Sequence, residues 1–155
     1  MMSSAVQTSG QRLWRAAILA PDAAVRGSRA ADAVARVSGA IFIVGGLVKF
    51  VLHGWELDAF RRFGLPAPEV LVIVIGALET AGGVLLLRRS LVAPVALALA
   101  VIMAVAVAVS GVGHGDVIPS LTLAPALLVA MIYLLARVAR ADGGAADGTT
   151  VRPGG

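Results

Sequence analysis

The sequence predicts an all-α membrane protein, a four-transmembrane-helix bundle with its N- and C-termini cytoplasmic. Three observations lead to this prediction. Hydrophobic residues make up 59% of the 155 residues and charged residues 14%, a composition far from that of soluble domains. A soluble chain of this length has no interior large enough for so much apolar surface, so lipid must cover much of it. The apolar residues also fall into four long segments, and most arginines flank these segments on one side.

The charge balance and the residue inventory exclude several classes of function. A formal net charge of +4 would suit a nucleic-acid partner, but the arginines flank apolar segments instead of lining a basic groove, so we expect no nucleic-acid binding. The chain has no cysteine, which excludes disulfides, thiol catalysis, thiolate zinc sites and iron–sulfur clusters. No cofactor motif is evident, so a redox role requires a bound or borrowed cofactor.

Residues 1–32 are predicted to be a basic cytoplasmic N-terminal segment. Within it, residues 13–20 form an apolar run that contains Trp14 and lies among arginines, which suits a short helix in the membrane interface. The run is too short to span a bilayer and ends at Pro21 and Asp22. A signal peptide is the alternative, since a basic start precedes the apolar run, although no cleavage site clearly follows it.

The next unit, residues 33–137, is predicted to hold the four spans, at about 33–55, 70–87, 91–111 and 117–136. The uninterrupted apolar part of the first span is too short alone for a membrane roughly 30 Å thick, so the charged residue near its end must snorkel or pair. The third span alternates valine and alanine, as strands do, but it is longer than the about 9–11 residues of a membrane strand, and we expect a helix. Residues 138–155 are predicted to be a disordered C-terminal tail.

Aromatic, glycine and proline residues predict further details of the connections. Between the first two spans, Leu57, Phe60 and Phe63 lie about three residues apart, which predicts a short helix with one apolar face on the membrane surface. Gly64 can end this helix. In the fourth span, Pro125 is predicted to kink the helix and to free a backbone carbonyl in the preceding turn.

Small residues in the first two spans predict where these helices pack. Gly39 and Gly45, with the adjacent Gly46, leave notches in the first span, and Gly76 and Gly83 lie near one face of the second. Small residues let helix backbones approach closely. We therefore predict that these glycines are helix-packing positions, where another helix backbone can approach closely. The same small-residue faces would also favour a homo-oligomer.

Basic residues divide unequally between the two sides of this four-span topology. One side has ten arginines, and the other has only Arg61 and Arg62. The ten are Arg12, Arg15, Arg26, Arg29, Arg36, Arg88, Arg89, Arg137, Arg140 and Arg152. Because cytoplasmic segments carry the excess of positive charge, the side with ten arginines, and with it both termini, is predicted to be cytoplasmic.

Two charged residues lie within the predicted spans. Lys49, the one lysine of the chain, is near the end of the first span, and Glu79 is near the middle of the second. An isolated charge in hydrocarbon costs about 2.5–3.5 kcal/mol, so such residues turn toward the bundle interior and find partners. On antiparallel helices their α-carbons differ in depth by roughly 7 Å, which a lysine side chain can bridge. We predict a buried charge pair, either a structural link or a site that passes a proton or binds a polar head group.

Five residues on the side opposite the ten arginines are candidates for binding a ligand such as a quinone. They are His53, Trp55, Phe60, His114 and Asp116. Asp116 is close enough in sequence to orient His114, but neither histidine has metal-ligand spacing with another donor, so no metal site is predicted. Ordinary surface histidines and an aromatic belt at the membrane interface are the alternatives.

Three groups of residues carry a resemblance to a known family. They are Gly39, Phe42, Gly45 and Lys49 in the first span, Phe60 with Gly64-Leu65-Pro66 after it, and the motif Gly-x-x-Glu-x-x-Gly-Gly at residues 76–83. In this combination the sequence resembles the DoxX family of small four-span bacterial membrane proteins. The resemblance covers roughly residues 34–137. It implies a four-helix bundle, a multi-pass protein of the bacterial plasma (inner) membrane, and a link to quinone-coupled or stress-related redox systems.

Some members of that family are subunits of thiosulfate:quinone oxidoreductase, and others associate with redox enzymes. The resemblance therefore implies redox-enzyme partner subunits in addition to the lipid bilayer. We expect a non-catalytic or accessory subunit of a redox or stress-defence assembly, not an enzyme on its own. The alternative is a quinone-binding subunit of a membrane oxidoreductase, in which Lys49 and Glu79 handle protons and His53 or His114 contacts the quinone. A small solute or lipid carrier, with the kink at Pro125 and the glycine-rich helix faces as a moving gate, is the remaining alternative.

Overall fold

The computed structural model describes residues 22–115 and 121–147, with side chains as far as 141, and its regular structure there is helical without any strand. In chain order the helices are α2 (Arg29–Val51), α3 (His53–Arg62), α4 (Pro68–Arg88), α5 (Val92–Val105), the π-helix η1 (Ala106–Val112) and α6 (Leu123–Asp147). A helical turn at residues 22–26 precedes α2. The interfacial helix expected at residues 13–20 lies outside the described residues.

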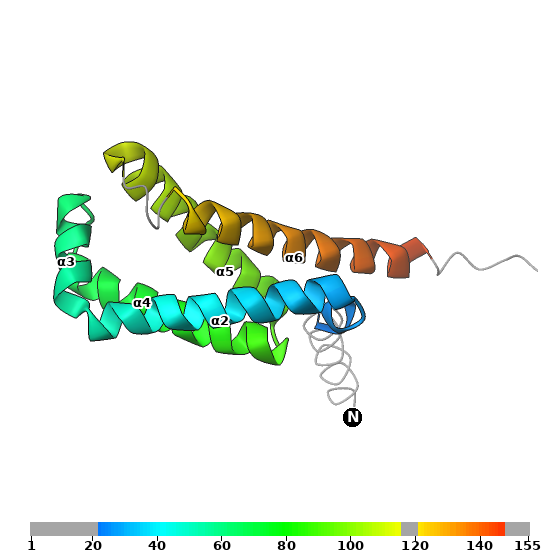
Figure 1. Cartoon of the computed structure of the whole chain (residues 1–155). Helices are drawn as coiled ribbons and strands as arrows, with labels where there is room; N and C mark the ends of the chain where they lie inside the picture. The colour runs from blue at the N-terminus through cyan, green and yellow to red at the C-terminus, as the bar shows by residue number, and fades with distance from the viewer. Residues whose placement is uncertain (1–21, 116–120, 148–155) are drawn as a thin grey trace, which may run out of the picture.

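Four helical segments are long and apolar enough to cross a membrane, namely α2, α4, α5 together with η1, and α6. The predicted fold class, an all-α membrane protein with four spans, is therefore confirmed. Helix α2 packs mainly against α4, and α5 packs mainly against α6. These two pairs converge near one end of the molecule and diverge toward the other, where α3 stands across them (Figure 1). We call the end where the pairs diverge the α3 end, and the end where they converge the basic end.

The outward faces of all four spans are apolar. Val37 and Val44 on α2, Ile73 on α4, Leu97 on α5 and Ile132 on α6 each expose more than half of their surface. In water such a distribution would be costly, whereas lipid can cover it on every side. The chain is therefore a multi-pass membrane protein whose helices contact the bilayer.

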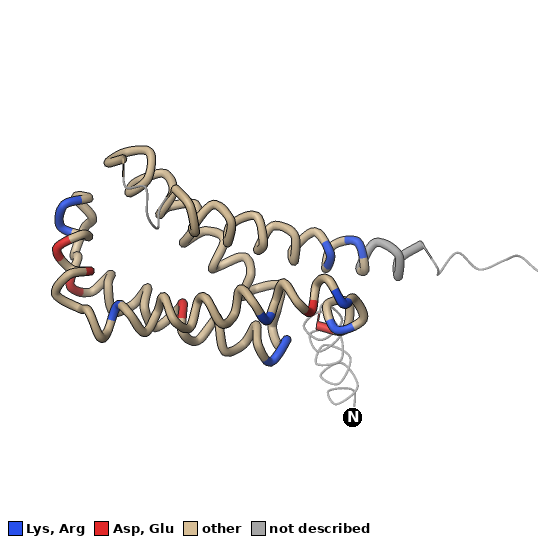
Figure 2. Tube along the Cα trace, in the orientation of Figure 1, with Lys and Arg blue, Asp and Glu red and all other residues tan. Residues whose placement is uncertain are grey.

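Charged residues gather near the two ends of the described helices, with few between them (Figure 2). At the basic end, one carboxylate links the start of α2 to the turn after α4. One oxygen of Asp32 is 3.1 Å from Arg36 Nη2, and the other is 2.9 Å from Arg89 Nη1. Arg61 and Arg62 belong to α3, at the opposite end. The division of arginines between two ends is thus present, and the assignment of the basic end to the cytoplasm stays a prediction.

The first span ends earlier than predicted, and α3 is a separate helix. The chain turns at Leu52, where φ is −104° and ψ is 37°, so the residues after Val51 leave the axis of α2. At the other end of α3, Gly64 has φ 66° and the Leu65 N–H donates to the Phe60 carbonyl at 3.2 Å. A left-handed glycine with this hydrogen bond closes a helix C-terminus, so the predicted stop at Gly64 is confirmed.

The prediction of a kink at Pro125 is wrong. Helix α6 begins at Leu123, so Pro125 lies in its first turn, where a backbone N–H has no partner within the helix and its loss costs little. The carrier alternative loses the hinge on which it depended. Helix α6 also continues to Asp147, so residues 138–147, expected to be part of a disordered tail, are helical.

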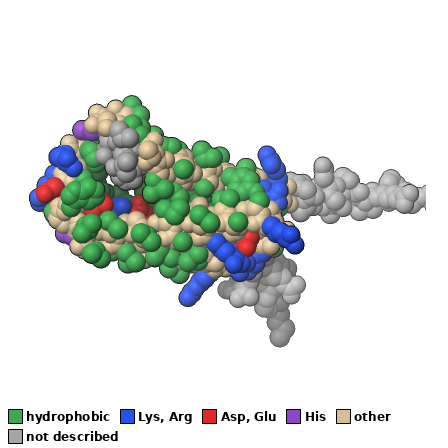
Figure 3. Space-filling view, viewed as in Figure 1, with side chains coloured by type: hydrophobic (Ala, Val, Ile, Leu, Met, Phe, Trp, Pro, Cys, Tyr) green, Lys and Arg blue, Asp and Glu red, His purple; other side chains and the backbone are tan. Residues whose placement is uncertain are grey.

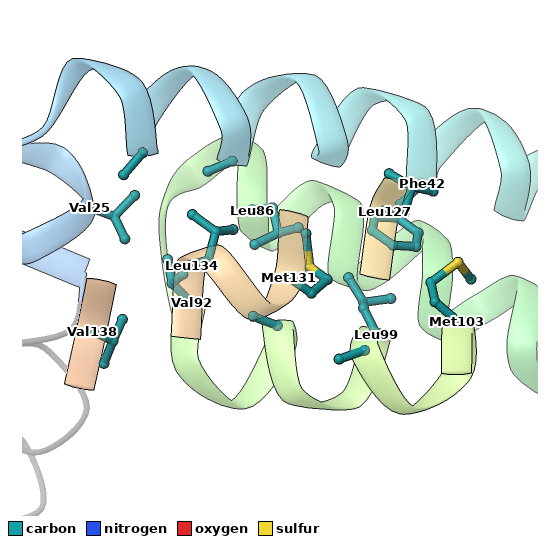
Figure 4. Close-up of a cluster of buried hydrophobic side chains, with 14 of the residues drawn as sticks. Val25, Phe42, Leu86, Val92, Leu99, Met103, Leu127, Met131, Leu134 and Val138 are labelled. Atoms are coloured by element: carbon teal, nitrogen blue, oxygen red, sulfur yellow. The ribbon is translucent and has the colours of Figure 1, made fainter. Parts of the chain in front are cut away.

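The apolar core occupies the half of the bundle nearer the basic end. Its buried side chains come from all four spans and from the turn before α2, and they point toward one another (Figure 4). They are Val25, Ala31, Ala35, Phe42, Leu86, Val92, Ala96, Leu99, Ala100, Met103, Ala124, Leu127, Met131, Leu134 and Val138. Val25 and Val138 mark one limit of this core, and Phe42 and Met103 mark the other, so tight packing stops before the α3 end.

Helices α2 and α4 approach closely at two pairs of glycines. A Cβ atom added to Gly39 would lie 2.8 Å from the Gly83 carbonyl oxygen, and one added to Gly46 would lie 2.6 Å from the Gly76 carbonyl oxygen. Ordinary side chains would therefore force the backbones apart. Gly45, which the sequence analysis places at this contact, is not part of it, since its nearest neighbouring atom would be 3.8 Å away. The adjacent Gly46 takes its place, because one residue turns a helix by about 100°.

A carboxylate from the N-terminal segment caps α5. Asp22 is only 2% exposed and accepts hydrogen bonds from the N–H groups of Leu91 at 3.1 Å and Val92 at 2.9 Å. Arg89 and Leu91 have φ values of 51° and 54°, so the turn between α4 and α5 holds two non-glycine residues in the left-handed region. No residue of the turn itself caps α5 through its side chain. Asp22 supplies that cap, a role the sequence analysis does not assign to it.

Candidate functional site

The two charged residues of the spans are in contact. Lys49 lies in the last turn of α2 and Glu79 lies within α4, and Lys49 Nζ is 2.9 Å from Glu79 Oε2. Their side chains are 14% and 6% exposed, so both charges are largely withdrawn from the surface. The close approach at Gly76, where an added Cβ would be 3.1 Å from Lys49 Cβ, brings the lysine stem against α4. The contact between the two charges that the sequence predicts is therefore present.

The ion pair leaves hydrogen-bonding capacity on its acidic partner. Glu79 Oε2 is buried and, among the described residues, has no hydrogen bond of good geometry, although the ammonium nitrogen is within 2.9 Å. The Lys49 ammonium nitrogen therefore approaches Glu79 Oε2 from a direction that is poor for a hydrogen bond, and the contact is an ion pair. Gly45 lies next to this oxygen without a side chain, at 3.8 Å from an added Cβ.

A pocket of about 150 Å³ lies over the ion pair at the α3 end, where the packed core has stopped. Residues from α2, α3, α4, α5 and η1 line it. They are Lys49, Trp55, Glu56, Ala59, Phe60, Arg62, Phe63, Leu65, Ile75, Glu79, Ile102, Val105, Ala106, Val109 and Ser110. Figure 3 shows acidic and basic side-chain atoms inside an opening bordered by apolar side chains. The divergence of the two helix pairs thus creates an apolar cavity with a charged floor.

Helix α3 and the turn after it form the aromatic wall of this pocket. Phe60 is buried there, while Trp55 is exposed at the rim. Of the three residues whose spacing predicts an amphipathic α3, Phe60 and Phe63 line the pocket and Leu57 does not, and the position of α3 at a membrane surface stays a prediction. Arg61 holds α3 to the start of α4, with Nη2 2.7 Å from Glu69 Oε1. The turn at Leu52 therefore sets one end of the wall, whereas this ion pair is exposed and contributes little to it.

The opposite wall comes from the end of α5 and from η1. A π-helix is wider than an α-helix and appears frequently at functional sites. Here it buries Ser110, which is 8% exposed and lines the pocket, together with Gly111. The sequence analysis expects a regular helix to about residue 111 and does not single out Ser110. No local pattern distinguishes this serine from one that faces lipid, because its direction depends on the helix type.

The structure brings together only part of the predicted ligand-binding set. Trp55 and Phe60 line the pocket, whereas His53 does not. His114 lies behind the wall: its ring centroid is 5.2 Å from that of Phe63, and its Nδ1 is 2.9 Å from the Val109 carbonyl oxygen. The pocket therefore does not include either histidine. His53 follows the turn at the end of α2, and His114 follows the end of η1, so both lie beyond the pocket lining. Asp116 lies outside the described residues.

Several lining residues were not predicted as ligand contacts, namely Glu56, Arg62, Phe63 and Ser110. The periodicity of α3 was an available signal for Glu56 and Phe63, which lie four residues before and three residues after Phe60, but not for Arg62, two residues after it. Within residues 22–115 and 121–141, no three histidine, aspartate or glutamate side chains come together as metal ligands would. The site is thus a pocket with one ion pair, aromatic and aliphatic walls and one buried hydroxyl.

These features define a class: a four-span membrane protein in which three of the spans, together with α3, line a ligand-sized pocket above a buried lysine–glutamate pair. A family model named DoxX matches residues 31–111, just over half of the chain. The protein belongs to the DoxX family. The matched residues run from α2 to η1 and include every residue that lines the pocket. A search of curated proteins and a search of solved structures gave no match.

Proposed function

We propose that this protein is an accessory subunit, without catalytic activity of its own, of a redox or stress-defence assembly in the bacterial plasma membrane. The observation that carries the proposal is the ion pair at 2.9 Å between the one lysine of the chain and Glu79. Each charge balances the other inside the bundle, which supports a role in holding α2 and α4 together rather than in breaking bonds. The resemblance to DoxX proteins that serve redox enzymes supplies the redox context.

Purification tests this role. The tagged full-length protein is isolated from membranes of its own host in a mild detergent, and redox-enzyme polypeptides are expected to co-purify with it. The matched control is an unrelated tagged four-span protein from the same membranes, prepared in parallel. If repeated preparations return the same polypeptides with both proteins, or none with either, the accessory role is wrong.

A quinone-binding subunit of a membrane oxidoreductase is the second candidate, and the pocket favours it. Its aromatic wall and its volume of about 150 Å³ suit the ring of a quinone, and Lys49 can donate a hydrogen bond to a ring oxygen. Phe60 and Phe63 would contact the ring face, and Ser110 supplies a further hydroxyl. A bound quinone would supply reversible two-electron redox chemistry.

Replacing Glu79 by glutamine tests this candidate, because the amide keeps the size of the side chain and removes its charge. The purified variant is expected to bind a short-chain ubiquinone analogue more weakly than the native protein does, because Lys49, the donor to the ring oxygen, loses the carboxylate that holds its ammonium group in the pocket. Unchanged binding, together with unchanged quinone-dependent turnover of any co-purified enzyme, would contradict a role of this site in quinone binding. Glu69→Gln at the exposed start of α4 serves as the control substitution.

A further inference from the structure

We propose that the pocket binds an uncharged single-ring compound that carries a hydroxyl group, of the phenol class, and that its floor distinguishes a hydroxyl from an oxygen that only accepts hydrogen bonds. This inference goes beyond the accessory role, which requires no small ligand. For the quinone-binding candidate it names the form that is held, because the reduced, hydroxylated ring is then preferred over the ring with carbonyl groups.

The volume and the walls of the pocket select one ring. At about 150 Å³ the pocket is comparable in volume to a protein cavity that takes up benzene, and a larger ligand would have to extend through its opening. Phe60 and Phe63 on one wall and Ile102 and Val105 on the other are apolar. Aromatic side chains pack on ring ligands face to face with an offset, or edge to face. The body of the ligand is therefore a flat apolar ring.

The charges of the pocket select a neutral ligand. The charged residues in its lining are two cations, Lys49 and Arg62, and two anions, Glu56 and Glu79. An anion drawn to Lys49 would meet the carboxylate 2.9 Å from that ammonium, and a cation drawn to Glu79 would meet the ammonium. A charged ligand of either sign gains no net electrostatic stabilisation, since the formal charges of the pocket lining cancel. A carboxylate or phosphate ligand is disfavoured for this reason.

The floor selects a hydroxyl group. An ammonium group has three N–H donors and no acceptor, and a carboxylate only accepts. Glu79 Oε2 is buried with no well-directed hydrogen bond among the described residues, and Lys49 Nζ lies beside it with further N–H groups to donate. A hydroxyl oxygen can accept from Lys49 while its hydrogen is donated to Glu79, and the ion pair need not separate. An ether or carbonyl oxygen makes only the first of these two bonds and leaves the carboxylate unsatisfied.

Three ring compounds of nearly equal size separate the contributions. Phenol can donate and accept, anisole can only accept, and toluene can do neither. The chain has two tryptophans, and Trp14→Phe leaves Trp55 at the pocket rim as the single fluorescent reporter. In detergent-purified full-length protein with this substitution, phenol is expected to quench Trp55 saturably, with a dissociation constant about tenfold or more below those of anisole and toluene.

Two substitutions in η1 give a matched control for partition into the detergent. Ala106 lines the pocket and Ala108 is exposed on the outer face, so Ala106→Leu fills the cavity while Ala108→Leu adds the same atoms toward lipid. Saturable phenol binding is expected to disappear in Ala106→Leu and to persist in Ala108→Leu. If both variants lose binding, or both keep it, the pocket is not the site and the proposal is overturned.

The double substitution Lys49→Met/Glu79→Met tests the floor itself. It replaces the ion pair by apolar side chains of similar length, a change that folded proteins often tolerate. Ring binding is expected to remain, with phenol, anisole and toluene now bound about equally. Equal binding of phenol and anisole by the native pair, or a phenol preference that survives the double substitution, would overturn the proposal. Co-purification of redox polypeptides is scored separately, so this proposal and the accessory role can fail independently.

Discussion

Two adjacent glycines of α2, Gly45 and Gly46, allow a matched test of how the first two spans pack. Both substitutions to alanine add one methyl group to the same turn of the same helix, and both change intrinsic helix propensity by the same amount. A Cβ at Gly45 would be 3.8 Å from its nearest neighbour, which is ordinary contact. A Cβ at Gly46 would be 2.6 Å from the Gly76 carbonyl oxygen and 2.7 Å from the Thr80 nitrogen.

The expected magnitude follows from what these contacts are. The carbonyl oxygen and the nitrogen belong to the backbone of α4, so no rotamer change relieves them and the helices must separate. Overpacking of this kind costs about 1–3 kcal/mol, and backbone contacts place Gly46→Ala near the upper figure. Because helix propensity cancels between the two variants, Gly46→Ala should be about 3 kcal/mol less stable than Gly45→Ala. Gly45→Ala should match the native protein or exceed it.

The assay is unfolding of the full-length protein in mixed micelles with increasing sodium dodecyl sulfate, followed by far-ultraviolet circular dichroism. Adding Thr80→Ala to Gly46→Ala removes the hydroxyl that the new methyl group meets most closely, but not the backbone contacts, so it should restore only part of the loss. Coincident unfolding curves for Gly45→Ala and Gly46→Ala would show that the two helices do not meet at this face, and the reasoning would be wrong.

Four further predictions follow from the ion pair, the cap, the tail and the charge distribution. Lys49→Met and Glu79→Met should each lower the free energy of unfolding by about 3–5 kcal/mol, because each leaves one buried charge unpaired, and the double variant should lower it far less. If the losses of the two single variants add up in the double variant in the same unfolding assay, the two residues are not coupled. Asp22→Ala should lower the free energy of unfolding by about 0.5–2 kcal/mol because α5 loses its cap. The control Asp58→Ala removes an exposed contact with Arg61 of 3.6 Å and should lower it by less than about 0.5 kcal/mol. Similar losses in the two variants would show that Asp22 does not cap α5. Truncation after Arg140 should leave stability unchanged because the last core side chain precedes it, and a lowered melting temperature would disprove this. Fluorescent-protein fusions at both termini should fluoresce in the cytoplasm, and a dark fusion at either end would overturn the assigned orientation.

Much of the fold could be predicted because its determinants are local. Span number and approximate length follow from runs of apolar residues, and the stop at Gly64 follows from the conformational freedom of glycine beside two prolines. The contact of Lys49 with Glu79 could be predicted as well, because an unpaired charge in hydrocarbon is costly and the chain has few partners to offer within its spans.

What could not be predicted depends on the rotation of helices and on contacts distant in sequence. The doublet at residues 45–46 marks a notch, but hydropathy does not determine which of the two glycines faces α4. The π-helix that turns Ser110 inward has no signature in a valine–alanine repeat. Pro125 was placed in the middle of a helix because the apolar run begins before the helix does. The cap supplied by Asp22 joins residues up to 70 positions apart, beyond the reach of any local pattern.

That cap has a consequence for biosynthesis. The acceptor is made long before its donors, since Asp22 leaves the ribosome 70 residues ahead of Val92. The Asp22 carboxylate therefore stays hydrated until the third span is inserted into the bilayer. Only then can it lose its water and accept hydrogen bonds from the first N–H groups of that span. A chain truncated at its N-terminus beyond Asp22 would keep all four hydrophobic segments that the insertion machinery recognises. The third segment would nevertheless enter the membrane with the N–H groups of Leu91 and Val92 lacking their hydrogen-bond acceptor.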